Sequence, residues 1–310
     1  MPSSFPSGFF NLNKPAGFTS RTVVNRVQKL LPRGTKLGHA GTLDPLARGV
    51  LIVASGYATR LVEYVQRLPK QYVAKFLLGR TSPTEDVDGP IEVLSNPPVP
   101  TLEQLQAVIQ ERFLGRIDQV PPAYSALKVD GRRAHELARA GEEVELAARG
   151  IEIFRCDILA YKYPELQILL ECSGGTYVRS LGRDLAESVG TGAVMSALTR
   201  TAIGQFHVGL SQELDALSRE NWKKHLIPVV EGVAELPRLE LSDDEFHVLA
   251  KGSARIESPR GRFKSDEIAA VDRHGRLIAI LSKRGDGVLG PKRNFAPLVM
   301  EADALGVGLG

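Results

Sequence analysis

Hydrophobic and polar positions along the chain follow two periods, one typical of amphipathic helices and one typical of strands. Apolar residues three and four positions apart predict helices at residues 21–31, 58–66, 101–113, 134–140, 180–189, 193–199 and 242–251, with further helix between 211 and 235. Short apolar or alternating runs predict strands at residues 8–13, 50–54, 70–79, 166–172, 200–208, 267–272 and 276–283, with another beginning near 151. The chain therefore mixes helices and strands throughout.

The character of the chain changes near residue 234. The stretch before it alternates helices, strands and long polar loops, whereas the stretch after it reads as a small β-rich unit. A turn at residues 272–275 joins two alternating strands there as a hairpin. We therefore expect two units, at residues 9–233 and 235–303.

Composition narrows the class of protein without naming a function. The chain has 310 residues, of which 43% are hydrophobic and 24% are charged, which is ordinary for a globular protein. A formal net charge of +3 is compatible with a nucleic-acid partner but does not argue for one. The chain has no signal-peptide pattern and no apolar run long enough to cross a membrane, so we expect a cytoplasmic protein. Its two cysteines are expected to be free thiols.

Residues 38–51 form the most unusual stretch, with three glycines, one proline and one acid between apolar runs. Glycine and proline shape tight loops, so Asp44 is expected on a rigid turn. A carboxylate held in this way can act as a nucleophile, an acid, a base or a metal ligand. His39 and Arg48 lie close to it in sequence. The alternative is that Asp44 only begins a turn, as most Asp-Pro pairs do.

Several other chemistries are excluded or unsupported. The acidic stretch 85–89 is similar to a calcium loop, but Gly89 comes too early and Pro97 stands where the bidentate Glu is needed. No phosphate-binding loop or nucleophile elbow occurs. Asp86 and Asp88 could supply a second carboxylate, but nothing in the sequence ties them to Asp44.

Two further segments offer aromatic and basic side chains. Tyr72 lies in a predicted strand, where its ring could stack on a nucleobase and its hydroxyl could exchange a proton. Tyr177 and Arg179 alternate on a strand-like stretch after Gly174 and Gly175. Arg179 could pair with a carboxylate such as Asp44. The plain alternatives are a core tyrosine and a simple strand–helix turn.

Five motifs in order resemble those of the TruB family of pseudouridine synthases. They lie at residues 13–17 (NKPAG), 38–51 (GHAGTLDPLARGVL), 70–74 (KQYVA), 121–128 (PPAYSALK) and 174–181 (GGTYVRSL). The resemblance implies an α+β catalytic domain with a mixed, mainly antiparallel sheet flanked by helices and loops. Residues 235–303 resemble a short PUA domain, a small RNA-binding β-barrel. The family isomerises uridine to pseudouridine in the T arm of tRNA, conventionally at position 55.

The resemblance also implies roles for single residues. Asp44 would be the catalytic aspartate, and Arg179 would pair with it. Tyr72 would stack on the uracil and assist the chemistry. His39 would fill the gap left by the flipped base, while Tyr177 and the Leu198 backbone would line the base pocket; the predicted substrate-binding residues are thus His39, Tyr72, Tyr177 and Leu198.

RNA phosphates would be contacted by Lys14, Arg60, Lys128 and the basic residues between 132 and 139. No cofactor or metal is expected, because substrate and product are isomers. The expected partner is tRNA alone, bound by a monomer that requires no protein partner and no membrane. The resemblance does not say whether the carboxylate attacks the sugar, attacks the base or abstracts a sugar proton.

Two alternatives stay open. One is a tRNA-binding or tRNA-folding module in which catalysis is secondary, which would need the RNA surface but not Asp44. The other is a synthase for another RNA, such as ribosomal RNA selected by a guide RNA. The chain lacks long basic tails and its C-terminal unit is short, which favours the stand-alone type.

Overall fold

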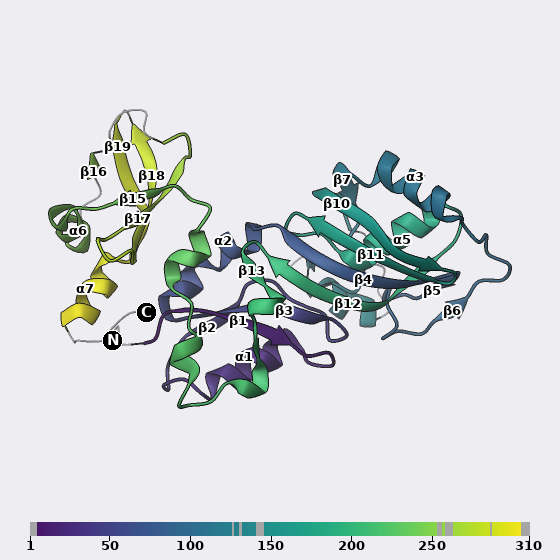
Figure 1. Ribbon diagram of the computed structural model, residues 1–310, viewed down its shortest axis with the longest axis horizontal. Helices are drawn as coiled ribbons and strands as arrows, with labels where there is room; N and C mark the ends of the chain where they lie inside the picture. The colour runs from purple at the N-terminus through teal and green to yellow at the C-terminus, as the bar shows by residue number, and fades with distance from the viewer. Residues whose placement is uncertain are drawn as a thin grey trace.

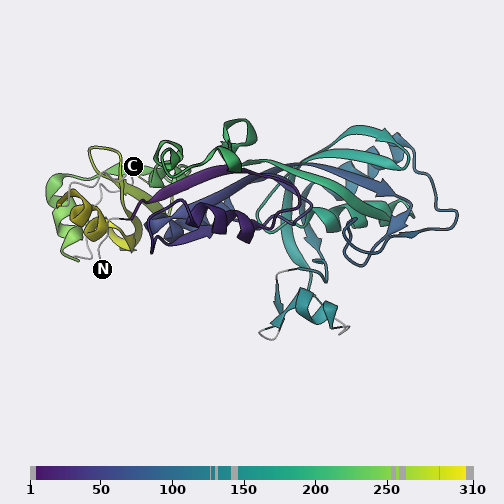
Figure 2. The same ribbon diagram turned by 90° about the horizontal axis from the view of Figure 1, so that it is seen from below.

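A computed structural model describes residues 5–125, 127–129, 132–140, 146–252, 256–257, 263–285 and 287–304. The described chain is elongated, with one large sheet along most of its length and a smaller unit of strands and helices at one end (Figures 1 and 2). The teal segment around α4 (Ala134–Arg139) projects from one face of the large sheet (Figure 2).

The large sheet has ten strands within the described residues. Their order is β14-β1-β3-β12-β4-β11-β10-β7, with β2 beside β3 and β13 beside β12. The bounds are β1 Gly8–Lys14, β2 Leu37–His39, β3 Arg48–Ser55, β4 Lys70–Leu78, β7 Gly115–Gln119, β10 Arg149–Lys162, β11 Glu165–Cys172, β12 Ala193–Ile203, β13 Phe206–His207 and β14 Gln212–Glu213. Only β1 with β14 and β3 with β12 pair in parallel. The sheet is therefore mixed and mainly antiparallel, which confirms the predicted fold class.

Helices begin where the sequence places capping residues. They are α1 Ser20–Gln28, α2 Val62–Arg67, α3 Leu102–Arg112, α4, and α5 Val178–Ser188. The Thr19 hydroxyl accepts the backbone N–H of Thr22 at 3.0 Å and so caps α1. Thr101 and Gln104 form a capping box at the start of α3. Two short ribbons complete the larger unit, β5 Arg80–Thr81 with β6 Glu92–Val93 and β8 Lys128–Val129 with β9 Arg132–Arg133.

The two halves of the large sheet meet at β3 and β12. This contact is short, because only Thr199 and Arg200 of β12 pair with Arg48 and Gly49 of β3. Gly49 has a φ of +102°, and a Cβ there would lie 2.2 Å from the carbonyl oxygen of Arg200. Only glycine fits this close crossing. The Asp44 loop emerges directly before it, so the junction of the two halves places the loop.

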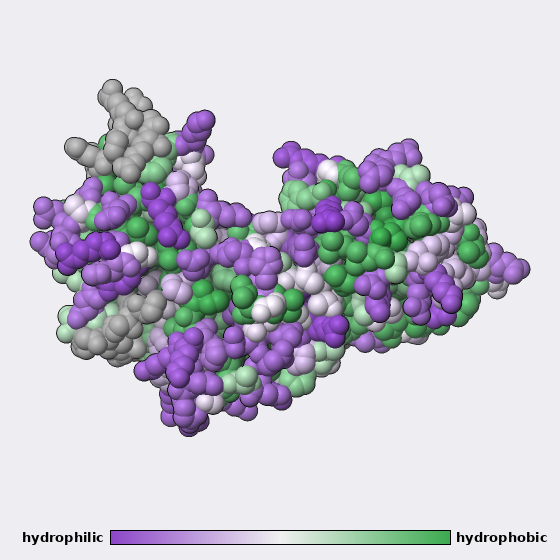
Figure 3. Space-filling model, viewed as in Figure 1, coloured by the Kyte–Doolittle hydropathy of each residue, from purple (hydrophilic) through white to green (hydrophobic). Residues whose placement is uncertain are grey.

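Clusters of buried hydrophobic side chains pack the helices against the sheet. One core cluster joins α3 and α5 to the inner face of β4, β11 and β10, and another joins α1 to β1 and β3. Hydrophobic surface also remains visible over the β10–β11 end of the sheet (Figure 3). Phe154 and Leu159 of β10 are each 50% exposed.

The C-terminal unit is built on a separate five-stranded sheet of the described residues, in the order β15-β17-β18-β19-β16. Its elements are β15 Arg238–Glu240, α6 Asp243–Ala250, β16 Ile256–Glu257, β17 Glu267–Val271, β18 Leu277–Gly285, β19 Val288–Asn294 and α7 Ala296–Ala304. The predicted hairpin corresponds to β17 and β18. Phe295 belongs to a core cluster that also contains Val229 and Val65, so the two units share buried apolar surface.

Three local predictions are wrong. Residues 193–199 form the first part of β12 rather than a helix, because pairing with β4 along the strand overrides the helix propensity of Ala, Met and Leu. The helix predicted between residues 211 and 235 is present only as three short 3₁₀ helices, η3 Leu214–Ala216, η4 Trp222–His225 and η5 Val229–Val233. Arg179 lies in the first turn of α5 and not on a strand-like stretch.

Candidate active site

The Asp44 loop connects β2 to β3 and is tied to the sequence before it. The Asp44 carbonyl accepts the N–H of Ala47 at 3.0 Å, and the Pro45 carbonyl accepts the N–H of Gly17 at 2.7 Å. The Ser20 hydroxyl accepts the N–H of Leu43 at 2.9 Å. These bonds hold the backbone on both sides of Asp44, while its side chain keeps 36% of its surface exposed. The carboxylate is therefore fixed in place and still reachable.

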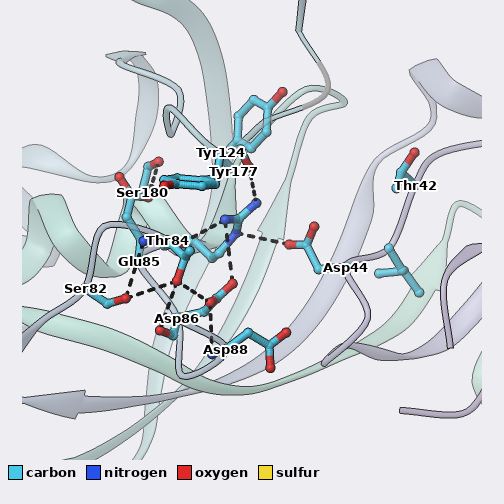
Figure 4. Close-up of polar contacts among 12 residues, drawn as sticks. Thr42, Asp44, Ser82, Thr84, Glu85, Asp86, Asp88, Tyr124, Tyr177 and Ser180 are labelled. Atoms are coloured by element: carbon cyan, nitrogen blue, oxygen red, sulfur yellow. Dashed lines mark hydrogen bonds and ion pairs between the residues drawn. The ribbon is translucent and has the colours of Figure 1, made fainter. Parts of the chain in front are cut away.

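Arg179 lies beside Asp44 with its side chain 7% exposed. Its Nε is 3.1 Å from Asp44 Oδ2, so the ion pair predicted from the sequence is present (Figure 4). Nη1 donates to the Thr84 carbonyl at 2.7 Å, and Nη2 donates to the Tyr124 carbonyl at 3.1 Å. A buried guanidinium whose donors face fixed oxygens cannot rotate freely, so Arg179 orients the Asp44 carboxylate.

Asp86 is the site residue that sequence reasoning failed to connect. Its side chain is buried, and Oδ2 lies 3.6 Å from Nη1 of Arg179 (Figure 4). Oδ1 accepts the Thr84 hydroxyl at 2.7 Å and the N–H of Asp88 at 3.2 Å. Arg179 thus links Asp86 to Asp44, although 42 positions separate the two acids. No local spacing could reveal this link, because β12 holds the Asp86 segment through a backbone bridge between Asp86 and Met195.

Glu85 anchors the same segment from the other side. It is buried, has a φ of 61°, and accepts the Ser180 hydroxyl at 2.7 Å together with a bond from Arg183. A left-handed non-glycine backbone is uncommon and needs such support. Asp88 is more exposed; burial raises its pKa, and the carboxylates of Asp86 and Asp44 raise it further.

Tyr72 and Leu198 lie on adjacent central strands, β4 and β12. Both are 7% exposed and belong to one core cluster with Leu43 and Ala47, which lie on either side of residues 44–46. Burial raises the pKa of the Tyr72 phenol, so it is protonated at neutral pH. The structure therefore brings Tyr72 and Leu198 to the base of the Asp44 loop.

Tyr177 caps the start of α5 next to Arg179. Its backbone N–H donates to Gln119 Oε1 at 2.9 Å, and its carbonyl accepts from Gln119 Nε2 at 3.0 Å. This pair of bonds joins α5 to β7. Burial raises the pKa of the phenol, while a hydrogen bond with Ser125 opposes that rise.

His39 ends β2, five residues before Asp44. Burial lowers its pKa, and the positive charges of Arg200 and Arg21 lower it further. The imidazole is therefore neutral near pH 7. A neutral, half-buried ring can fill space or stack, and it adds no charge to the site.

The structure does not support a phosphate contact for Lys14. The residue is fully buried, and its ammonium donates to the carbonyls of Phe18 at 2.5 Å, Pro15 at 3.1 Å and Pro45 at 3.3 Å. Burial lowers its pKa to about 8. Lys14 instead supports the Asp44 loop through its hydrogen bond to the Pro45 carbonyl. This corrects the role expected from the sequence.

Arg60, another predicted phosphate contact, lies against the C-terminal unit. Arg60 is exposed; its guanidinium stands 4.8 Å from the Phe295 ring centroid and donates to the Asn294 carbonyl at 3.2 Å. It therefore faces the C-terminal unit rather than the Asp44 site. The Lys128 side chain, like several between 132 and 139, lies outside the described part of the structure.

The described residues contain no group of three or more side chains suited to hold a metal ion. They also include no helix long and apolar enough to span a membrane.

Comparison with known proteins identifies the family. A sequence profile described as "TruB family pseudouridylate synthase (N terminal domain)" matches residues 28–178. A "tRNA pseudouridine synthase B" of Syntrophomonas wolfei is 39% identical, over 93% of this chain and 98% of the relative. One of Corynebacterium aurimucosum with the same name is 41% identical, over 90% of this chain and 93% of the relative.

Solved structures agree with the sequence relatives. The structure titled "Crystal Structure of a Cbf5-Nop10-Gar1 Complex" matches 94% of this chain and 86% of its own, with a TM-score of 0.70 and 25% identity. "Structure of H/ACA RNP bound to a substrate RNA containing 2'-deoxyuridine" matches 94% of this chain and 85% of its own, with a TM-score of 0.69 and 25% identity. The chain belongs to the TruB family of pseudouridylate synthases and is an isomerase.

Proposed function

We propose that the chain isomerises uridine to pseudouridine in the T arm of tRNA, at the position conventionally numbered 55. The observation that carries this proposal is the Asp44 carboxylate, exposed at one side and held by the buried Arg179 at 3.1 Å. An exposed but immobile carboxylate is suited to act on a base presented from outside.

The reaction needs no further reagent. The bond between C1′ of the ribose and N1 of uracil breaks, the base turns, and C5 bonds to C1′. The hydrogen on C5 leaves as a proton and N1 gains one, so atoms and charges balance. Asp44 acts at the reacting nucleotide, and Tyr72 at the base of the same loop stacks on the uracil and assists proton loss from C5.

The target uridine must leave its stack before Asp44 can reach it. Extrusion of a base costs a few kcal/mol, which a side chain that fills the gap can offset. His39 is suited to that role because it is half-buried and neutral, as its lowered pKa indicates. Tyr177 and Leu198 line the pocket for the extruded uracil.

Affinity for tRNA comes from other parts of the chain. Lys128 and the basic residues between 132 and 139, on the segment that projects from the sheet, contact phosphates, with a strong dependence on salt. Arg60 extends this surface toward residues 235–303, which form a PUA-like RNA-binding domain. The catalytic domain spans residues 9–233. The enzyme acts as a monomer in the cytoplasm and requires no protein partner.

The main alternative is a synthase that takes its target from a guide RNA. The matched solved structures named above are titled as complexes of Cbf5 with partner proteins or as an RNP, at 25% identity. The relatives named tRNA pseudouridine synthase B are 39% and 41% identical over nearly the whole chain. The closer identity and the matching length favour tRNA.

The test uses the purified chain alone with a tRNA transcript that carries tritium at C5 of uridine. Isomerisation releases the tritium, and mapping of the product locates the pseudouridine. We expect the wild type to modify the T arm, and Asp44→Asn to release none while binding tRNA within about tenfold, or ~1.4 kcal/mol, of the wild type. Asp215→Asn, which changes a surface acid paired with Arg26, is the matched control. Product formation by Asp44→Asn at the wild-type rate would refute the proposal.

A further inference from the structure

Arg200 is a buried charge that the proposed chemistry does not use. It lies on β12, is 2% exposed, and is among the largest fully buried side chains of the described residues. Burial of a full charge is costly unless its hydrogen bonds are satisfied. A buried arginine therefore needs a structural or functional reason.

The guanidinium of Arg200 is directed at the backbone of the Asp44 loop. Nε donates to the Val50 carbonyl at 2.8 Å, Nη2 to the Gly41 carbonyl at 3.1 Å, and Nη1 to the Thr42 carbonyl at 3.4 Å. Gly41 and Thr42 precede Asp44, whereas Val50 follows it. One side chain thus ties both ends of the loop to β12.

Both the main chain and the side chain of Arg200 lie against glycines of the same loop. Its carbonyl oxygen occupies the space that a Cβ at Gly49 would need, at 2.2 Å. Its Nη1 lies 3.5 Å from the place of a Cβ on Gly41, whose φ is +100°. The loop backbone therefore lies directly against Arg200 at two glycines, one on each side of Asp44.

Arg200 also faces the other side chains of the site. On the paired strands β12 and β4, Arg200 stands opposite Tyr72. Its positive charge opposes the rise that burial causes in the pKa of Tyr72, and it lowers the pKa of His39. Because arginine does not lose its proton in proteins, both effects are permanent.

We propose that Arg200 is a positioning residue for the isomerisation, which fixes the Asp44 loop relative to Tyr72. The inference rests on the proposed function, since it assigns a role in that reaction. It predicts that a change at Arg200 slows the chemistry while leaving tRNA affinity intact, because the side chain is buried and does not reach RNA.

The decisive variant is Arg200→Lys, with Arg200→Met as the stronger change. Lysine keeps the charge but cannot present a planar fork of donors to three carbonyls. Displacement of a reacting group by about 1 Å can cost about 100-fold in rate. We expect a fall of about that size in the single-turnover rate of Arg200→Lys and a larger one in Arg200→Met. The dissociation constant for tRNA should stay within about threefold of the wild type.

Val27→Ala is the control for lost stability. Val27 of α1 is 1% exposed in the core cluster that joins α1 to β1 and β3, and we assign it no part in the reaction or in binding. Its truncation should lower stability without slowing the single-turnover rate. Thermal unfolding of every variant is measured beside its rate.

The outcomes are distinct. A folded Arg200→Lys with a single-turnover rate within about threefold of the wild type would overturn the inference. An Arg200→Lys that does not fold, or that slows no more than Val27→Ala, would show a folding role alone and would also overturn it. If Arg200→Met does not fold, Arg200→Lys decides. A wild type that makes no pseudouridine would refute the proposed function instead.

Discussion

Asp86 Oδ2 lies 3.6 Å from Nη1 of Arg179, the guanidinium whose Nε faces Asp44. The two carboxylates therefore share one buried cation through different nitrogens. Asp44 is partly exposed, whereas Asp86 is 4% exposed. The exposed acid is available to a substrate, and the buried acid holds the cation that orients it.

Asp86→Asn tests this arrangement. Asparagine retains an oxygen for the Thr84 hydroxyl but removes the negative charge beside Arg179. We expect the single-turnover rate of tritium release to fall by about 10- to 100-fold, because a loosened Arg179 no longer fixes Asp44. Affinity for tRNA should change by less than about threefold, since Asp86 is buried. A folded variant with the wild-type rate would show that Arg179 needs no second carboxylate.

Tyr72→Phe separates stacking from proton transfer. Phenylalanine keeps the ring on β4 and removes only the hydroxyl, so binding of tRNA should be nearly unchanged. We expect the chemical step to slow by about 100-fold or more, because the hydroxyl assigned to proton transfer is lost. The check is the single-turnover rate at saturating enzyme beside the equilibrium binding constant. Equal rates for Tyr72→Phe and the wild type would leave stacking as the only role of Tyr72.

Local patterns in the sequence predicted much of the fold. The strand at residues 70–78, the helix α3 and the hairpin of β17 and β18 each depend on residues within a few positions of one another. The Asp44 loop was also recognisable, since its glycines, Gly41 and Gly49, need the positive φ values that the structure shows. Features of this kind are determined by residues close together in the sequence.

Features that depend on distant pairing were not predictable. Residues 193–199 have helical composition, yet β12 forms because β4 and β3 lie on its two sides. From the sequence, Lys14 was expected at the surface, but its buried ammonium donates to the carbonyl of Pro45, which is 31 positions away in the sequence. The link from Asp86 to Asp44 likewise depends on Arg179 of α5, which lies between the two carboxylates in the folded chain. Spacing along the chain carries no information about such contacts.

The buried lysines predict how stability changes with pH. Burial lowers the pKa of Lys14 and of Lys70 from 10.5 to about 8. Above pH 8 the folded state therefore binds fewer protons than the unfolded state, so the unfolding free energy rises with pH, by up to about 1.4 kcal/mol per pH unit for each lysine. Above pH 9 the buried Cys156 and Cys172, whose pKa values are raised from 9.0, act in the opposite direction.

Urea unfolding between pH 7 and 9, followed by the fluorescence of the single tryptophan, Trp222, checks this prediction. Lys14→Met should reduce the slope of the unfolding free energy against pH, because one of the two lysines no longer contributes. The comparison is made between slopes, since the variant also loses three hydrogen bonds and some stability at every pH. An unfolding free energy that falls from pH 8 to pH 9 in the wild type would contradict the assignment.

The shared core predicts that the two units unfold together. Phe295, at the start of α7, is fully buried in the cluster that contains Val229 and Val65 of the larger unit. Its ring also lies 5.2 Å from the ring of Tyr57, between centroids. Phe295→Ala removes this contact from both sides of the junction. We expect a loss of about 3–5 kcal/mol in the free energy of unfolding, with one cooperative transition in both the variant and the wild type.

Phe154→Ala is the control for Phe295→Ala, because Phe154 of β10 is 50% exposed and far less of its surface is packed. It should cost less than about 1 kcal/mol. Urea unfolding is followed by circular dichroism and by tryptophan fluorescence, and coincident curves indicate one transition. The contrary outcome is two transitions, with Phe295→Ala shifting only the transition that does not change Trp222 fluorescence. It would show that the C-terminal unit is an independent domain and that the shared cluster contributes little to the stability of the larger unit.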